Sequence, residues 1–281
     1  MAQLNSLVRP MRKTDLAQVK SLILRDRISN SFIESRLWEM QYETFNLHEE
    51  LYVYEVNSEI VSALYNGANT IPLETNPESQ LAFANKLIES NRRSSSLLGS
   101  VNEVMGLWKI LKPYWGIARD VRANQPLLNI DQPPLLAPDP LVRRALPREI
   151  DLILPACISM FTEEVGVSPV SAGGLNAYRS RISELISAGR SLVRIDRGEV
   201  VFKAEIGLVT DAVCQVQGVW VPPQYRGRGY AKAGMAAVVN YARRHFAPNV
   251  SLYVNDYNER ARAIYKKVGF VQHSTFATVL F

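Results

Sequence analysis

One stretch of the sequence has residue types and a spacing that suit the binding of a phosphate group. Arg226-Gly227-Arg228-Gly229-Tyr230-Ala231-Lys232 follows two prolines and precedes an alanine-rich run. This order predicts a strand that ends at a loop, with a helix after it. Glycines at the start of a helix let the backbone approach a ligand closely, and the first helical amides have no partner within the helix. With the positive charges around them, these amides predict an anion site. An ordinary strand–loop–helix junction with exposed arginines is the alternative.

Composition is typical of a globular protein. The chain has 281 residues, of which 47% are hydrophobic and 21% charged, and this length predicts one large or two medium domains. A net charge of +5 suits an anionic ligand. The basic residues are scattered, however, so no nucleic acid is expected as a partner.

Cysteine usage and hydropathy favour a cytoplasmic protein. Cys157 and Cys214 lack the spacing of a metal site and are expected to be buried thiols in a reducing compartment. The first twelve residues do not resemble a signal peptide, and no apolar run is long enough to span a bilayer. We therefore expect no membrane as a partner.

The elements around the glycine loop are expected to form a sheet flanked by helices. Runs rich in apolar and β-branched residues, separated by turn residues, predict strands at 141–146, 191–195, 199–208, 213–221 and 250–254. Helical spacing of apolar residues predicts helices at 148–164, 175–188, from the loop to Pro248, and at 259–268. Gly269 follows the last helix where helices commonly end, and a terminal strand or hairpin is expected over 270–281.

The first half of the chain shows a similar succession of elements. Strands are expected at 6–10, 51–56, 60–65, 69–73 and 94–98, and helices from 14, from 31, at 76–89 and at 101–111. Prolines then cluster between 125 and 147, which favours extended chain. We therefore place an N-terminal domain at 1–130, a proline-rich linker at 131–140 and a C-terminal domain at 141–281. A loop within one large domain is the alternative.

The last third of the chain resembles the GNAT (Gcn5-related N-acetyltransferase) superfamily. The resemblance rests on ordered pieces: Gly218-Val219-Trp220-Val221-Pro222, Arg226 to Ala231, Leu252-Tyr253-Val254-Asn255, Asn258 with Ala261 and Tyr265, and Gly269-Phe270. The whole chain is similar to actinobacterial two-part GNAT proteins with an uncharacterised N-terminal region, and in architecture to mycothiol synthase. This implies an α+β fold with a mixed sheet, in tandem with a degenerate N-terminal GNAT-like half. The counterpart loop of that half, 70–77, lacks the glycine motif.

The resemblance implies acetyl-CoA as co-substrate and assigns positions to it. The pantetheine arm is expected to pair with the backbone of 219–221, and the pyrophosphate to lie on the amides from 226 to 232. The implied cofactor-binding residues are Val219, Trp220, Val221, Arg226, Gly227, Arg228, Gly229, Tyr230, Ala231, Lys232, Asn255 and Asn258. Asn258 also suits a helix cap, and both roles are compatible.

Direct acetyl transfer to an amine needs two proton movements. The amine must be neutral when it attacks, and the leaving thiolate needs a proton or a hydrogen-bond donor. Tyr265 matches the tyrosine that recurs near the sulfur in this superfamily, although a core tyrosine with a polar tip is the alternative. Glu205, a charged residue inside a strand, is the expected base. Glu163 and Glu164 end the helix that borders the acceptor site in this superfamily, so they are the expected substrate contacts, or else a solvated helix end.

Two functions from different classes remain open at this point. The first is an acetyl-CoA-dependent N-acetyltransferase acting on a small-molecule amine or a protein amine, as a monomer or homodimer. The second is a non-catalytic acyl-CoA-binding module on the same scaffold. No His, Cys and Asp pattern indicates a metal or a covalent nucleophile. The intact glycine loop and Tyr265 favour the transferase.

Overall fold

The chain folds into two compact units that differ from the expected domains. The computed structural model describes residues 6–42, 51–90 and 92–281. Unit 1 takes the chain up to Leu127, with Tyr253–Tyr257 and Gln272–Phe281, and unit 2 takes Leu128–Leu252 and Asn258–Val271. The division therefore falls before the proline-rich segment, and unit 1 recruits two pieces from the C-terminal end of the chain.

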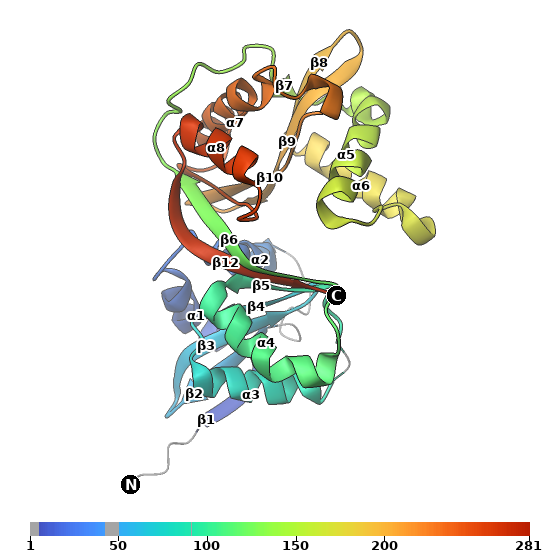
Figure 1. Ribbon diagram of the computed structural model, residues 1–281. Coiled ribbons are helices and arrows are strands. Elements are labelled where there is room, and N and C mark those ends of the chain that lie inside the picture. Colours follow the sequence, from blue (N-terminus) through green and yellow to red (C-terminus); the bar gives the residue numbers. More distant parts are fainter. Residues whose placement is uncertain (1–5, 43–50, 91) are drawn as a thin grey trace. The chain divides into compact units, whose positions relative to one another are not determined.

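Unit 1 is a mixed sheet with helices on both faces (Figure 1). Its elements are β1 (Ser6–Pro10), α1 (Leu16–Ile23), α2 (Ser31–Tyr42), β2 (Leu51–Val56), β3 (Glu59–Asn66), β4 (Asn69–Leu73), α3 (Pro77–Ile88), β5 (Ser96–Ser100), α4 (Val101–Trp115) and β6 (Asp120–Ile130). The strand order is β1-β2-β3-β4-β5-β12-β6, where β12 is Val271–Leu280. β4 and β5 are parallel, whereas β5 and β12 are antiparallel.

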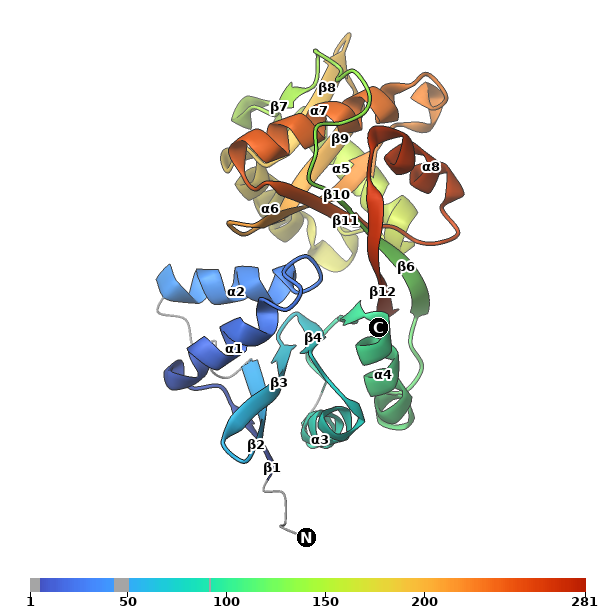
Figure 2. The same ribbon diagram turned by 90° about the vertical axis from the view of Figure 1, so that its left-hand side faces the viewer.

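Strand alternation explains why unit 1 has helices on both faces. Leu51 and Val53 of β2 join one buried cluster with residues of α1 and α2. Tyr54 and Leu64 join a second cluster with residues of α3 and α4. Successive side chains of a strand point to opposite faces of the sheet. A strand with apolar side chains on both faces therefore needs helices packed on both faces. Figure 2 shows α1 and α2 together on one side of β3 and β4.

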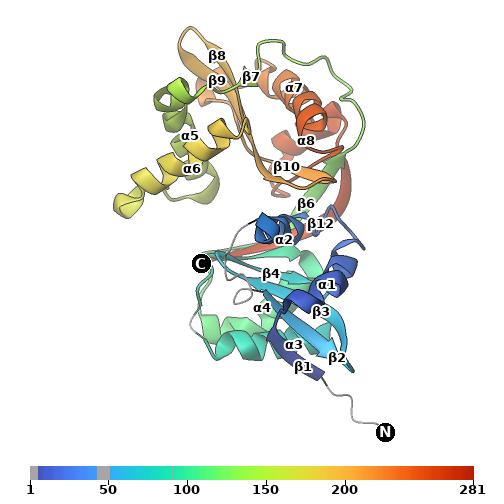
Figure 3. The same cartoon turned by 180° about the vertical axis from the view of Figure 1, so that it is seen from behind.

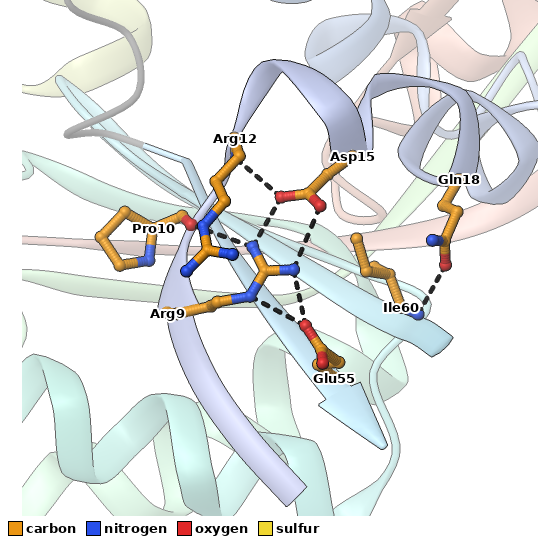
Figure 4. Close-up of polar contacts among 7 residues, drawn as sticks. All are labelled: Arg9, Pro10, Arg12, Asp15, Gln18, Glu55 and Ile60. Carbon is orange, nitrogen blue, oxygen red and sulfur yellow. Dashed lines mark hydrogen bonds and ion pairs between the residues drawn. The ribbon is translucent and has the colours of Figure 1, made fainter. Parts of the chain in front are cut away.

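A buried arginine joins β1 to β2 and to the start of α1 (Figure 4). Arg9 donates from Nη1 to Asp15 Oδ2 at 2.6 Å and from Nη2 to Glu55 Oε2 at 2.6 Å, and its side chain is only 13% exposed. The backbone N–H of Arg12 donates to Asp15 at 2.7 Å. The hydrogen bonds from Arg9, opposed by partial burial, hold the pKa of Asp15 below its usual range. Edge strand β1 is thus fixed by side chains as well as by its ladder.

Unit 2 has the same succession of elements as unit 1. Its elements are β7 (Arg143–Arg144), α5 (Ile150–Val165), α6 (Leu175–Ser187), β8 (Ser191–Asp196), β9 (Glu199–Val209), β10 (Val213–Trp220), α7 (Tyr230–His245), β11 (Asn249–Tyr253) and α8 (Glu259–Val268). The strand order is β11-β10-β9-β8-β7, with the last residues of β6 beside β11. β10 and β11 are parallel, like β4 and β5 of unit 1. Figure 3 shows α5 and α6 side by side next to β8 and β9.

Each unit's sheet contains a strand segment from the other half of the sequence. β12 closes unit 1, where Thr278 Oγ1 donates to Gln125 Oε1 of β6 at 2.6 Å. The end of β6 joins unit 2, where Asn129 Nδ2 donates to Asn249 Oδ1 of β11 at 3.2 Å. The sequence did not predict β6, because Pro126 and the polar residues before it concealed its alternation.

The proline-rich segment packs along unit 2 and is not a free linker. The Leu135 N–H donates to the Val268 carbonyl at 2.8 Å, and the Asp139 N–H donates to the Ala233 carbonyl at 2.9 Å. Asp139 also pairs with Arg194 at 2.5 Å. The expected strand at 141–146 is reduced to the two residues of β7. Prolines explain this arrangement, since they leave fewer backbone donors and favour extended chain that follows a surface.

Among the helices of the described residues, none combines the length and apolarity that a bilayer crossing requires.

Candidate functional site

The glycine loop opens α7 in the way that the sequence predicts. β10 ends at Trp220, a short 3-10 turn covers Pro223–Tyr225, and α7 begins at Tyr230. Gly227 and Gly229 have φ values of +83° and +87°, and a Cβ built on either would meet no atom within 4 Å. Both glycines are therefore required by backbone conformation, and open space lies in front of them.

The start of α7 presents unpaired amides. Within the described parts of the chain, the backbone N–H groups of 227–231 donate to no protein acceptor, and the first amide engaged is that of Lys232, which donates to Gly229 O at 3.1 Å. The helix dipole adds partial positive charge at the same place. Backbone donors converging on open space form a site for an anion.

A pocket of about 460 Å³ lies in front of this loop, within the size range of small-ligand sites. It brings together most of the predicted cofactor residues with the candidate acid and one predicted substrate contact. The lining comprises Glu163, Val219, Trp220, Val221, Tyr225, Arg226, Gly227, Gly229, Tyr230, Ala231, Lys232, Asn258, Arg260, Ala261, Ala263, Ile264, Tyr265 and Lys267. Arg228, Asn255, Glu164 and Glu205 were predicted at the site but do not line this pocket.

The lining carries excess positive charge. Lys232, Arg260 and Lys267 form no ion pair with any described residue, and Glu163 is the only acidic residue of the lining. Arg260, Ala263, Ile264 and Lys267 were missed from the sequence. Their spacing of three, four and seven residues places them on one face of α8 and was the signal that could have found them.

Glu163 is held by the cofactor loop. It accepts from Arg226 Nη2 at 2.7 Å with both carboxylate oxygens and from Trp220 Nε1 at 3.1 Å. The Arg226 hydrogen bonds lower the pKa of Glu163, with burial acting in the opposite direction. Arg226 Nε also donates to the Val221 carbonyl at 2.9 Å. Glu163 therefore fixes the loop, and its predicted contact with a substrate would compete with Arg226.

Tyr265 is a buried tyrosine with its hydroxyl in a desolvated place. It is 7% exposed and packs against Phe270, as a core tyrosine would, yet it also lines the pocket. Burial raises its pKa, and the negative charge of Glu164 raises it further. A hydroxyl of this kind stays protonated at neutral pH and remains a donor. Glu164 itself is exposed at the end of α5, close enough to act on Tyr265 through its charge.

The two asparagines have different surroundings. Asn258 caps α8 by accepting from the Ala261 N–H at 3.1 Å, and it also lines the pocket, so its two predicted roles are compatible. Asn255 belongs to unit 1 and is engaged there. Its Oδ1 accepts from Gln125 Nε2 at 2.8 Å, and its Nδ2 donates to the Tyr257 hydroxyl at 2.8 Å. These bonds, which no local sequence pattern shows, occupy the amide predicted to contact the cofactor.

Glu205 is not available as the sequence suggested. It is 3% exposed, and its Oε1 lies 2.7 Å from Lys203 Nζ, while Lys203 is fully buried. Cys157 Sγ lies 3.4 Å from the same oxygen. Burial would lower the pKa of Lys203, but the contacts with Glu205 and Cys157 oppose burial, and the pKa is raised. The Glu205 carboxylate is thus engaged by a buried ammonium and does not line the pocket.

A β-bulge separates β10 from β9 beside the pocket. Gln217 pairs with Glu205 and Trp220 pairs with Lys203, so β10 advances three residues while β9 advances two. Gly218, inside the bulge, has a φ of +58°. The extra residue bends the strand and interrupts its ladder just before Val219, the first pocket residue of β10.

The counterpart loop of unit 1 is filled by the chain's own side chains. Asn76 caps α3 by accepting from the Ser79 N–H at 2.9 Å. Glu103 Oε1 accepts from the Thr75 N–H at 2.5 Å. The Glu103 carboxyl group and the Asn76 side chain thus each occupy an amide that an external anion would need, which explains physically why this half is degenerate.

In the part of the chain that the structure describes, no group of His, Cys, Asp and Glu side chains is arranged to hold a metal ion.

Comparison with known families assigns both halves. Residues 161–270 match the acetyltransferase (GNAT) family, and residues 49–153 match a domain of unknown function, DUF4081. No curated protein matches the chain.

Solved structures share the fold over the whole chain. A GCN5-related N-acetyltransferase from Sphaerobacter thermophilus is 16% identical, with 98% of this chain and 95% of that chain covered and a TM-score of 0.65. A Drosophila protein is 14% identical, with 99% of both chains covered and a TM-score of 0.67. A tandem GNAT protein from the clavulanic acid biosynthesis pathway is 14% identical, with 98% of both chains covered and a TM-score of 0.53.

These matches and the repeated succession of elements confirm an α+β tandem GNAT fold with a degenerate N-terminal half. Residues 161–270 therefore form a domain of the GNAT acetyltransferase family, which indicates an acyltransferase.

Proposed function

We propose that the protein is an acetyl-CoA-dependent N-acetyltransferase that moves the acetyl group directly to a primary amine. The observation that carries this proposal is the start of α7. There, free amides and two glycines of positive φ open into a pocket that also contains Lys232, Arg260 and Lys267, cations without an ion pair among the described residues. An acyl-CoA is anionic at its phosphates and apolar along its arm, and this lining suits both parts.

The proposed placement of acetyl-CoA follows the lining. The pyrophosphate would accept from the amides of 227–231, with Lys232 close by. The pantetheine arm would run along the backbone of Val219, Trp220 and Val221, where the bulge has opened the ladder. Arg260 and Lys267 would add positive charge along α8.

Tyr265 is the proposed donor to the leaving sulfur. Its raised pKa keeps the hydroxyl protonated, so the group can stabilise or protonate a thiolate. As the amine nitrogen forms the new C–N bond, the C–S bond breaks and the thiolate receives a proton. Before this step, the acceptor must lose a proton from its ammonium form, because only the neutral amine can attack.

The acceptor is proposed to be cationic before it reacts. Glu163 and Glu164 place negative charge at the end of α5. Glu164 acts electrostatically on Tyr265 and is therefore close to the proposed reaction centre. A small-molecule amine and a protein amine both meet this description.

Calorimetric titration with acetyl-CoA and CoA tests the proposal. We expect micromolar-range binding to the wild type and at least a tenfold loss in Gly229→Asp, whose carboxylate would crowd and repel the pyrophosphate. Gly198→Asp is the matched control, because Gly198 also has a positive φ (+80°) and open space but lies in the β8–β9 turn outside the pocket. A folded wild type that binds neither ligand would refute the proposed cofactor.

A further inference from the structure

Lys203 and Glu205 form an ion pair in a place where charges are costly. Their side chains are 0% and 4% exposed, and they lie two residues apart on the same face of β9. Lysine is almost never fully buried unless it is paired. A buried ion pair commonly stabilises a fold no better than apolar residues of similar volume, because both ions lose their hydration. Stability alone therefore does not account for this pair.

The ammonium has a second partner, which is the backbone of the bulge. Lys203 Nζ donates to the Gly218 carbonyl oxygen at 3.0 Å. The bulge lies directly on the pair: a Cβ built on Gly218 would lie 3.0 Å from Glu205 Oε2 and 3.1 Å from Lys203 Nζ. This closeness explains glycine at position 218 as much as its positive φ does.

The Gly218 carbonyl and the Val219 N–H belong to one peptide unit. In a planar trans peptide the C=O and N–H bonds point in opposite directions. By holding the carbonyl on its own side of the strand, Lys203 directs the Val219 N–H to the other side. Val219 is the residue at which β10 enters the pocket lining.

Glu205 has a supporting part in this arrangement. A lone buried ammonium would tend to lose its proton, but the carboxylate at 2.7 Å raises the pKa of Lys203 against the effect of burial. A charged ammonium is the stronger hydrogen-bond donor to a carbonyl. Burial also raises the pKa of neighbouring Cys157, to about 12, so this thiol brings no competing charge at neutral pH.

We propose that Lys203, paired with Glu205, is a positioning residue that aims the Val219 N–H at the carbonyl oxygen of the bound acyl group. This inference rests on the proposed function, because it takes acyl-CoA as the ligand of the pocket. The pair never touches the thioester, and it acts through the orientation of a single peptide group. A donor aimed at this oxygen lowers the barrier because negative charge develops there during transfer.

The decisive variant is the double substitution Lys203→Met/Glu205→Leu. It removes both charges and leaves apolar side chains, so no buried ion is left without a partner. We expect a folded protein whose affinity for CoA stays within about twofold of the wild type, because the amides at α7 are untouched. We expect kcat for acetyl transfer to fall by about 10- to 100-fold, less than the loss typical of removing such a donor outright.

A spectroscopic measurement makes the test independent of the acceptor. Acetyl-CoA labelled with ¹³C at the thioester carbonyl is bound to each protein, and its carbonyl stretch is read by difference infrared spectroscopy. A hydrogen bond from Val219 lowers the stretching frequency in the wild type, and this shift should be lost in the double variant. Wild-type kcat and an unchanged carbonyl shift in a folded double variant would overturn the proposal.

Gly218→Ala decides the matter if the double variant does not fold. The substitution leaves both charges in place, but its methyl group would crowd Glu205 and Lys203 and displace the carbonyl. Loss of the infrared shift with retained CoA affinity supports the positioning role, whereas an unchanged shift refutes it. If the wild type fails to bind acetyl-CoA at all, the proposed function fails instead. Amide hydrogen exchange at 218–220 then still tests whether Lys203 fixes the bulge. Faster exchange in the double variant would support this role, and unchanged exchange would contradict it.

Discussion

At the scale of single residues, Tyr265 is both a core side chain and a candidate proton donor. We expect Tyr265→Phe to reduce kcat by about 10- to 1,000-fold, with the affinity for CoA unchanged, because the ring packing against Phe270 is retained. Steady-state kinetics and calorimetry measure the two effects. Tyr241→Phe is the control, since its hydroxyl donates to the Gly189 carbonyl away from the pocket.

The raised pKa of Tyr265 also has a kinetic consequence. Because the hydroxyl stays protonated beyond the usual tyrosine range, kcat should show no fall caused by loss of this proton below about pH 10. Full activity in Tyr265→Phe would leave the residue with a packing role only.

Arg226 is shared between the fold and the proposed ligand. Glu163 holds its guanidinium with both carboxylate oxygens at 2.7 Å, partly exposed to water. A phosphate must compete with this pair, so Glu163→Gln should tighten acetyl-CoA binding by up to about fivefold, which corresponds to the strength of an exposed ion pair. Isothermal titration measures the change.

Glu164→Gln is the matched control for Glu163→Gln. It removes the same charge from the adjacent position, outside the pocket lining. If both variants bind acetyl-CoA more tightly by the same factor, the cause is the loss of a negative charge and not the release of Arg226.

At the scale of elements, the first turn of α4 contains an unusual carboxylate, Glu103, which lies against the backbone just before α3. Burial raises the pKa of Glu103 to about 7, although the Thr75 N–H opposes this and the charge of Glu74 adds to it. The folded state thus binds this proton more tightly than the unfolded state does. Stability contributed by the protonated form is complete at acidic pH and is lost as the pH rises through about 7.

Glu103→Gln removes this titration and keeps an oxygen that accepts from Thr75. We expect the variant to exceed the wild type in free energy of unfolding by about 1–3 kcal/mol at pH 8, and to match it near pH 4. Chemical denaturation at the two pH values measures the difference. Glu78→Gln, on the exposed side of α3, should show no such pH dependence. The same difference at both pH values would contradict the titration of Glu103.

The junction of β1, β2 and α1 depends on Arg9. We expect Arg9→Met to cost about 1–3 kcal/mol at neutral pH, because it leaves Asp15 and Glu55 without their shared donor. The pKa of Asp15 is depressed, so this stabilisation is present above its ordinary value of 3.8 and is lost as the pH falls through the lowered folded value. Denaturation curves at pH 7 and pH 3 check both statements.

Arg25→Met provides the comparison for Arg9→Met. Its ion pair with Glu74 is 59% exposed on the arginine side and should contribute little. Equal losses in the two variants would show that burial of Arg9 is not the cause.

Local sequence patterns predicted the bounds of helices and strands in both units better than they predicted the contacts between them. The helix at 259–268 and the strands at 51–56 and 69–73 have the expected bounds, because apolar periodicity and turn residues mark them clearly. Helix α4, expected at 101–111, continues to Trp115 through Pro113, although proline disfavours a helix interior. Tertiary packing decided this point, and a local pattern does not contain it.

The site residues show the same contrast between local sequence pattern and long-range contacts. The glycine loop, Tyr265 and Asn258 lie within or next to a motif, so the sequence could place them together at one pocket. The partners of Glu205 and Glu163 depend on long-range pairing with Lys203 and Arg226. No spacing rule connects residues that far apart, so the roles predicted for these carboxylates did not allow for their ion pairs.

At the scale of the whole molecule, neither unit is a continuous piece of sequence. A chain that ends at Ile130 lacks β12, which pairs with β5 in unit 1. We expect such a fragment to aggregate or to lack cooperative unfolding, because it exposes the edges of β5 and β6. The same fragment with residues 272–281 joined through a flexible linker should fold. Circular dichroism and sedimentation measure both, and a monomeric, cooperative fragment 1–130 would show that β12 is dispensable.

Because unit 1 needs β12, its sheet cannot be completed until β12 has been synthesised. About 140 residues separate β6 from β12, so at 5–20 residues per second the ribosome needs roughly 7–30 s to supply the strand that completes unit 1. During that interval the sheet of unit 1 has a gap next to β5. We expect chaperones to bind this exposed strand edge, and a chain truncated before β12 to be prone to aggregation. In this protein, therefore, residues 271–280, made long after β5, decide when the first half can finish folding.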